Sequence, residues 1–279
     1  MLDALRCPLC REGLAAEDRA LRCTAGHSFD VARAGYVSLL TGSSPTSGDD
    51  DAMARARDRF LATGAYEPIR ELIRHLVPGR PGPNSSSHPR TVQEVGCGTG
   101  YYLAGVLDAL EGARGLGTDT STRALRFAAR CHPRAAAAAF DVFAPFPLRD
   151  DSVDVLLDVF APRNPAEFAR VLHPDGMLVV VRPAPDHLAE LRERVPGMVS
   201  LDPRKEERLH EALDPLFAPE DTRELRFTLT LQSAQAQDLV AMTPSARHVT
   251  AEQLDQLIPE PMDVTVSVVA SSHRVRPPR

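Results

Sequence analysis

The chain has 279 residues, 43% of them hydrophobic, so it can bury a substantial core in one large domain or two unequal ones. The sequence contains no run of about eighteen apolar residues, the length that a membrane-spanning helix needs. Residues 1–10 also lack the apolar stretch of a signal peptide, so we expect a cytoplasmic protein without membrane contact. Its 32 basic and 38 acidic residues give a net charge of −6, so any nucleic-acid ligand must be held by a local basic patch.

Three of the five cysteines lie within the first 23 residues, and a histidine follows them. Cys7, Cys10, Cys23 and His27 form the pattern C-x2-C-x12-C-x3-H. Four such ligands suit a closed, tetrahedral Zn²⁺ site, and a segment with so few apolar residues needs a metal to fold. We therefore expect a structural zinc ribbon over residues 1–42. Incidental free thiols and an iron–sulfur centre are the alternatives.

The segment between this ribbon and residue 90 has the character of a connection. Thr41 to Asp51 is polar and without periodicity, which is typical of a linker. From Asp51 to Leu76 apolar residues recur at three- and four-residue steps with a break at Gly64, which predicts two short helices. Pro78 to Pro89 is rich in Pro, Gly and Ser and is typical of a loop. Residues 43–90 are thus expected to hold a linker and helices.

Beyond residue 90 the chain alternates strand-like apolar runs with helical stretches, which is typical of a parallel sheet covered on both faces. The expected strands are Thr91–Val95, Gly115–Asp119, Ala137–Asp141, Val153–Val159 and Met177–Val181. The expected helices between them are Tyr102–Glu111, Ser121–Cys131, Pro165–Leu172 and His187–Arg194.

The last hundred residues break this alternation. Two strands, Leu225–Leu231 and Met262–Val269, flank helices over Ala234–Met242 and Thr250–Leu257. Two strands on either side of a helical segment predict an antiparallel pair that closes one edge of the sheet. For residues 91–279 we therefore expect an α/β, Rossmann-like fold with a seven-stranded, mostly parallel sheet.

A glycine-rich loop follows the first of these strands. The run Glu94–Gly100 reads EVGCGTG, the next strand ends in Asp119 and the third in Asp141. Glycines let the backbone approach a ligand, Asp119 is placed to accept hydrogen bonds from ribose hydroxyls, and Asp141 lies where an adenine amino group could be read. The candidate cofactor-binding residues of this region are Gly96, Gly98, Thr99, Gly100, Asp119 and Asp141.

The spacing of these glycines distinguishes between cofactors. A nicotinamide enzyme more often shows GxGxxG, with a helix N-terminus aimed at a pyrophosphate, whereas here the third glycine comes one residue early. The shorter loop resembles motif I of class I S-adenosylmethionine-dependent methyltransferases. A dinucleotide enzyme, and glycines used only for a tight strand-to-helix turn, remain the alternatives.

Three further segments carry a more specific resemblance. The run His27–Leu40, the segment Arg55–Pro68 and the motif Val159–Pro162 resemble the RlmA family across essentially the whole chain. That resemblance implies methylation of N1 of a guanine in the hairpin 35 loop of 23S rRNA. The Ala- and Arg-rich composition and the Asn-Pro that follows Arg163 are most similar to the tylosin-resistance branch, which implies guanine 748 instead of 745 and resistance to mycinosylated macrolides.

The resemblance also assigns roles to residues. It places the zinc ligands on Cys7, Cys10, Cys23 and His27, and the methyl-donor contacts on Tyr66, Gly98, Thr99 and His187. Thr99 stands where many relatives carry an acid. From the sequence alone, a core aromatic residue is the alternative for Tyr66, and capping or packing is the alternative for His187. A homodimer on the RNA is also an expectation from the family.

Two hypotheses about chemistry come from position and charge. Asp158, at the end of the fourth strand, is a candidate base for the N1 proton of guanine, with strand capping as its alternative. Residues 52–90 hold seven arginines against three acids, so Arg55 and Arg59 are candidate phosphate contacts, with a solvated helix face as the alternative. A small-molecule methyltransferase and a zinc-ribbon interaction module with an inactive methyltransferase domain are the rival functions.

Overall fold

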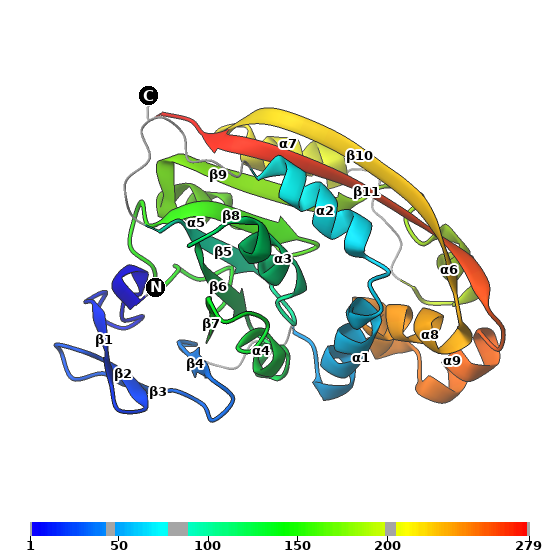
Figure 1. Ribbon diagram of the computed structural model, residues 1–279, viewed down its shortest axis with the longest axis horizontal. Coiled ribbons are helices and arrows are strands. Elements are labelled where there is room, and N and C mark those ends of the chain that lie inside the picture. Colours follow the sequence, from blue (N-terminus) through cyan, green and yellow to red (C-terminus); the bar gives the residue numbers. More distant parts are fainter. Residues whose placement is uncertain (1, 43–47, 78–88, 199–204, 278–279) are drawn as a thin grey trace.

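The computed structural model describes residues 2–42, 48–77, 89–198 and 205–277. Residues 43–47 of the predicted linker and 78–88 of the predicted loop lie outside these residues. In the described part a small N-terminal sheet lies beside a large twisted sheet that is covered by helices (Figure 1). No helix among the described residues is both long and apolar enough to cross a bilayer.

The large sheet has eight strands in the order β10-β11-β9-β8-β5-β6-β7-β4. Strands β4 to β9 pair in parallel within it, and β11 pairs antiparallel with both β9 and β10, which confirms the antiparallel edge. The strands are β4 Tyr36–Ser38, β5 Thr91–Val95, β6 Arg114–Asp119, β7 Ala135–Ala139, β8 Val153–Val159, β9 Leu172–Pro183, β10 Phe217–Leu231 and β11 Met262–Val275.

Helices pack on both faces of this sheet (Figure 1), and the sequence explains where several begin. Asp50, Ser121 and Asn164 each accept a hydrogen bond from a first-turn amide, which satisfies a backbone donor that has no partner within its helix. The helices are α1 Asp51–Ala62, α2 Glu67–Leu76, α3 Tyr101–Ala109, α4 Thr122–Ala128, α5 Pro165–Val171, α6 Ala189–Arg194, α7 Lys205–Leu213, α8 Ser233–Ala241 and α9 Ala251–Leu257, with short 3₁₀ turns at Leu2–Ala4 and Pro244–His248.

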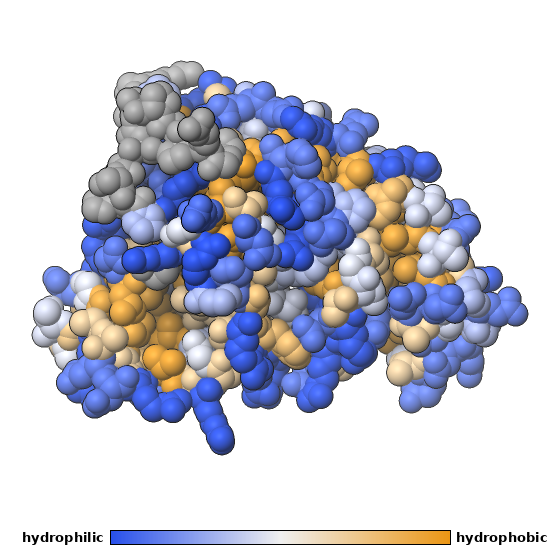
Figure 2. Space-filling model, in the orientation of Figure 1, coloured by the Kyte–Doolittle hydropathy of each residue, from blue (hydrophilic) through white to orange (hydrophobic). Residues whose placement is uncertain are grey.

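The sheet separates two main apolar clusters. One packs α2, α3, α6, α8 and α9 against one face and includes Ile69, Leu103 and Val266. The other packs α5, α7 and the N-terminal segment against the opposite face and includes Phe146 and Phe168. On the face seen in Figure 2, hydrophilic side chains cover most of the surface and hydrophobic residues gather in recessed areas between them.

The N-terminal segment forms its own three-stranded antiparallel sheet from β1 Leu14–Glu17, β2 Ala20–Cys23 and β3 Ser28–Asp30. It then contributes β4 to the large sheet, where Tyr36 pairs with Ala137. The prediction of seven strands was therefore one short. The eighth comes from the predicted ribbon segment because Val37 and Leu39 are apolar and bury beside β7, whose edge would otherwise lack a partner.

Other boundaries differ from the expectations. β7 ends at Ala139, two residues before Asp141, and α6 begins at Ala189, after His187. β10 begins at Phe217 instead of Leu225, and α7 was not predicted. Both missed segments are rich in charged residues, so their local patterns carried little apolar periodicity.

Candidate active site and metal centre

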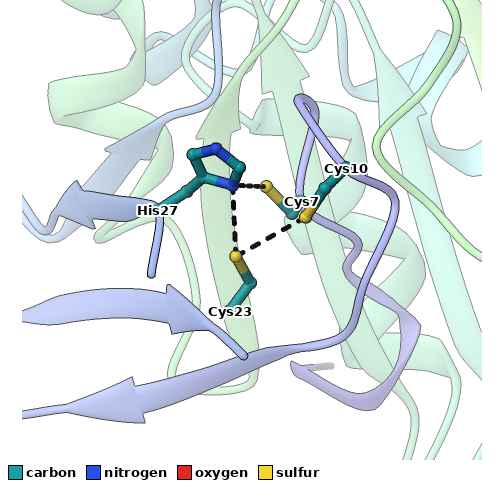
Figure 3. A group of neighbouring side chains, drawn as sticks. All are labelled: Cys7, Cys10, Cys23 and His27. Atoms are coloured by element: carbon teal, nitrogen blue, oxygen red, sulfur yellow. Dashed lines mark hydrogen bonds between the residues drawn. The ribbon is translucent and has the colours of Figure 1, made fainter. Parts of the chain in front are cut away.

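The three early thiols and His27 meet at one point of the N-terminal segment. The Cys7 and Cys23 sulfurs lie 3.5 and 3.4 Å from Nδ1 of His27, and the sulfurs of Cys10 and Cys23 lie 3.6 Å apart. All four ligand atoms lie within 4.8 Å of one another, and Figure 3 shows the side chains converging. Tetrahedral Zn²⁺ with Zn–S bonds of about 2.3 Å places sulfurs roughly 3.7 Å apart, so the donor set fits zinc.

This metal centre is closed and structural. Two thiols come from the turn before β1, one from the end of β2, and His27 directly precedes β3. The four ligands fill a tetrahedral shell, so no position remains for a reacting group. Apolar residues of the same segment, including Leu5 and Leu21, belong to the cluster that also holds Phe146 of the large domain. Zinc binding therefore supports the packing of this segment on the large sheet.

A cavity of about 310 Å³ opens at the carboxyl ends of β5, β6, β7 and β8. This size suits a small molecule. It lies at the point where the strand order reverses, since the chain runs from β5 outward to β7 and then returns to β8 on the other side of β5. Of the predicted cofactor residues, the lining includes Tyr66, Gly96, Gly98, Asp119 and Asp141.

The glycine loop comes close to its surroundings. Gly96 and Gly98 adopt φ values of +59° and +53°, and Gly100 has a φ of +81° where the chain enters α3. An added Cβ would lie 2.7 Å from the Cβ of Ala161 at Gly96 and 2.9 Å from Cδ of Arg57 at Gly98. Thr99 is buried in the turn. At Gly96 and Gly98 the loop therefore presents bare backbone to the cavity.

Two carboxylates shape the cavity on either side of this loop. Asp119 accepts hydrogen bonds from the amides of Gly98 at 2.9 Å and Ser121 at 2.8 Å, so it holds the loop while it lines the cavity. Glu94, 1% exposed, accepts from the amide of Leu103 at 2.9 Å. Burial raises the pKa of both carboxyl groups above their ordinary values. Hydroxyl groups of a ligand can donate hydrogen bonds to Asp119, which lines the cavity, while Glu94 binds the first turn of α3.

Asp141 lies just beyond β7, where its Oδ1 accepts from the amide of Phe143 at 2.9 Å. It was predicted as the last residue of the strand and instead begins a turn, but it still lines the cavity. Asp141 and Asp119 line the same cavity at the ends of neighbouring strands, and the predicted contact of Asp141 with an adenine stays a prediction.

Sequence reasoning missed a role for Arg57 in this cavity. Arg57 projects from α1, forms two hydrogen bonds with the carboxylate of Asp49 at 2.7 and 3.1 Å, and donates to the Met242 carbonyl at 2.6 Å. It thereby joins α1 and the segment after α8 beside the glycine loop. The local excess of arginines pointed to this helix but did not distinguish Arg57 from its exposed neighbours.

Tyr66 lies in the lining of the cavity, whereas His187 lies behind Phe160, a residue of the lining. Burial raises the pKa of the Tyr66 hydroxyl above the ordinary value. Burial lowers the pKa of His187 to about 4, so its ring is neutral near pH 7 and Nδ1 accepts from the Ser267 amide at 3.2 Å. The ring of His187 stacks on Phe160, which lines the cavity. The predicted donor contact of His187 stays a prediction.

Asp158 is fully buried beside the loop that follows β8. Its Oδ2 lies 2.9 Å from Nε of Arg163, and its Oδ1 accepts from the Ala161 amide at 3.3 Å. These contacts make Asp158 a positioning residue for residues 160–163. The role of Asp158 as a base stays a prediction.

The two predicted phosphate contacts lie on the exposed side of α1. Arg55 pairs with Asp51 at 2.8 Å, and Arg59 pairs with Asp238 of α8 at 2.6 Å. Both side chains are more than half exposed, so water screens these pairs and each contributes little to stability. Arg55 and Arg59 can therefore exchange a carboxylate partner for a phosphate with little loss of stability.

The pH dependence of stability is expected to change in a Glu94→Gln variant. Burial raises the pKa of Glu94 from 4.5 to about 8, so the native state binds more protons than the unfolded state between these values. Wild-type stability therefore falls as pH rises from 4.5 to 8, by an amount on the order of 5 kcal/mol, whereas glutamine keeps the acceptor for the Leu103 amide without ionising.

Urea unfolding of the wild type and the Glu94→Gln variant from pH 5 to pH 8.5 measures this difference. Other titrating groups are common to both proteins and cancel in the comparison. Parallel stability curves for the two proteins would contradict the assignment of a raised pKa to Glu94.

Comparison with known proteins matches both parts of the chain. The family model "RlmA, N-terminal" matches residues 5–43, and "Methyltransferase domain" matches residues 93–180. Two solved structures with a TM-score of 0.50 show the same fold. One is a type II methyltransferase from Anaeromyxobacter dehalogenans (19% identity, 76% of this chain and 97% of that chain), and the other is a methyltransferase from an antibiotic biosynthesis pathway of Anabaena variabilis (14%, 73% and 96%).

Three curated relatives extend over nearly the whole length. A Micromonospora griseorubida protein named as a 23S rRNA (guanine-N1)-methyltransferase is 44% identical over 98% of both chains. The 23S rRNA (guanine(748)-N1)-methyltransferase of Streptomyces fradiae is 42% identical over 98% of this chain and 97% of its own, and a Bacillus subtilis relative named as a 23S rRNA (guanine-N1)-methyltransferase is 33% identical over 94% of each. The four converging zinc ligands agree with the ribbon that the first family model describes, and the cavity beside the glycine loop agrees with a methyltransferase domain. The chain therefore belongs to the RlmA family and is an S-adenosylmethionine-dependent methyltransferase.

Proposed function

We propose that this enzyme methylates N1 of a guanine in the hairpin 35 loop of 23S rRNA, at guanine 748, and so protects the ribosome against mycinosylated macrolides such as tylosin. The observation that carries the choice of nucleotide is the 42% identity to the Streptomyces fradiae guanine-748 enzyme over nearly both chains. An enzyme with this substrate acts in the cytoplasm, and two copies on the RNA are part of the proposal.

The arrangement of the site suits this reaction. S-adenosylmethionine supplies a methyl group on a positively charged sulfur, and Tyr66, Gly98, Asp119 and Asp141 are the cavity residues that would hold the donor. A bond forms between N1 and the methyl carbon as the carbon–sulfur bond breaks, and the N1 proton leaves to a base or to water. The guanine must be unpaired or flipped out, because N1 is protected inside a Watson–Crick pair.

The test incubates the full-length protein with methyl-labelled S-adenosylmethionine and 23S rRNA from cells that lack this modification. N1-methylguanine stops reverse transcription, so primer extension locates the modified nucleotide. A stop at guanine 748 supports the proposal, and a stop at 745 corrects the nucleotide. Absence of RNA labelling by a protein that binds S-adenosylmethionine would overturn the proposed substrate and favour a small-molecule acceptor.

RNA binding is expected to depend on Arg55 and Arg59. If these side chains contact phosphates, an Arg55→Gln/Arg59→Gln variant releases fewer counterions and lowers the slope of log K against log salt by about 1 to 2. Filter binding of a hairpin 35 transcript across salt concentrations measures the slope. Arg223→Gln is a matched control, because Arg223 also forms an exposed ion pair, with Asp221 on β10. Equal slopes for all three proteins would exclude the phosphate contacts.

A further inference from the structure

Phe160 is an aromatic side chain that the fold leaves exposed at the donor cavity. Among the described residues only four large hydrophobic side chains are exposed: Leu2, Leu9, Phe143 and Phe160. Two of the four, Phe143 and Phe160, line the same cavity. Two exposed aromatic rings that line one cavity are unusual on a protein surface in contact with water alone and indicate a ligand.

The backbone at Phe160 is strained. Phe160 has a φ of +57°, a conformation that disfavours a bulky side chain, and its amide donates to the Val181 carbonyl at 3.0 Å. Such strain persists where the surrounding structure holds it, and it clusters at functional sites. Here the ring of His187 stacks on Phe160 with centroids 5.9 Å apart, and the ring of Tyr102 packs edge-on with its centroid 6.4 Å from that of Phe160. The neutral His187 ring thus supports an aromatic side chain that is still 40% exposed.

Phe160 and Phe143 lie on opposite sides of the glycine loop. Phe143 follows β7, beyond Asp119 and Asp141, on the side where the donor's ribose and adenine belong. Phe160 follows β8, on the other side of β5, and the neighbouring Ala161 touches Gly96. With the donor on the β5 to β7 side, as proposed above, the β8 side is left for the acceptor.

We propose that Phe160 is the platform on which the substrate guanine stacks while its N1 edge faces the donor. This inference rests on the proposed function and names the residue that positions its substrate. Once the N1 proton has left, the N1 lone pair that attacks the methyl carbon lies in the plane of the base, so a partner that covers one face leaves the Watson–Crick edge free to point at the methyl group. Stacking on Phe160 also replaces the stacking that the base loses when it leaves the RNA loop.

Three variants of Phe160 test this role. In Phe160→Leu and Phe160→Gly the single-turnover rate of rRNA methylation is expected to fall about 10- to 100-fold, the range for loss of one base–aromatic stack. The dissociation constant for S-adenosylmethionine should stay within about twofold, and Phe160→Tyr, which keeps the ring, should keep the rate within about threefold.

Thermal unfolding separates this role from simple packing. Glycine adopts positive φ freely, so Phe160→Gly is expected to keep or raise the melting temperature while it loses methylation. Phe143→Leu is the contrasting variant and should weaken S-adenosylmethionine binding, whereas Phe160→Leu should not. Leu2→Ser is the neutral control, because Leu2 is equally exposed at the amino ends of the strands.

Each remaining outcome counts against the inference. Methylation within threefold of wild type in both Phe160→Leu and Phe160→Gly would overturn it and leave the proposed function intact. A lower melting temperature with weakened donor binding in Phe160→Gly would show that the ring packs the donor cavity. If wild-type protein fails to methylate 23S rRNA, the proposed function and this inference both fall.

Discussion

A Cys23→Ser variant is expected to lose its zinc and, with it, thermal stability and rRNA methylation. Cys23 lies close to both His27 and Cys10, so serine removes a ligand at the centre of the cluster. Structural zinc contributes folding free energy directly. The ribbon shares an apolar cluster with the large sheet and provides β4 at its edge, so the whole chain should unfold earlier. We expect a loss of at least about 3 kcal/mol, or roughly 10 °C.

Metal analysis and calorimetry of the purified variant measure these effects. Cys131→Ser is the matched control, since Cys131 is a free thiol outside the cluster, and it should keep one zinc per chain. Donor binding should suffer less than methylation, because the described lining of the donor cavity begins at Gly48, beyond the ribbon. A Cys23→Ser protein that melts and methylates like wild type would refute a structural role for zinc.

The metal site and the donor loop are the parts of the site that the sequence predicts best. The four zinc ligands lie within the first 27 residues of the chain, so their spacing alone limits how they can meet. The glycine loop and Asp119 are also local, since they follow neighbouring strands whose ends share one edge of the sheet. β5 and β8 were predicted to the residue. β8 is a mainly apolar run that is buried on both faces, and β5 ends directly at the glycine loop, which marks its boundary.

Contacts between distant segments could not be predicted in this way. The Arg57 contact with Met242 joins residues 185 positions apart, and the stacking of Phe160 on His187 depends on how β8 and the segment after β9 pack. β7 was placed two residues too late because a run of alanines has no alternation, and pairing with β6 sets its register. The first half of β10 is held by β11, where Phe217 pairs with Val275. A local pattern contains none of this information.

A Gly96→Ala variant is expected to lose S-adenosylmethionine binding, whereas a Gly112→Ala variant keeps it. Both glycines have positive φ, +59° and +74°, so alanine strains the backbone at each by about 1–2 kcal/mol. Their surroundings differ. A Cβ at Gly112 meets nothing within 4 Å, whereas at Gly96 it would lie 2.7 Å from the Cβ of Ala161. The difference between the variants therefore isolates the close approach of the donor loop to the segment after β8.

Calorimetric titration with S-adenosylmethionine measures the effect. We expect the dissociation constant of Gly96→Ala to rise at least about 100-fold, which corresponds to the loss of two or more hydrogen bonds to the donor. Adding Ala161→Gly removes the methyl group with which the new side chain collides, so the double variant should recover part of the affinity while the backbone strain persists. If Gly96→Ala binds as well as Gly112→Ala, the loop has room for a side chain. If the double variant recovers nothing, the positive φ, and not the contact with Ala161, is what requires glycine at this position.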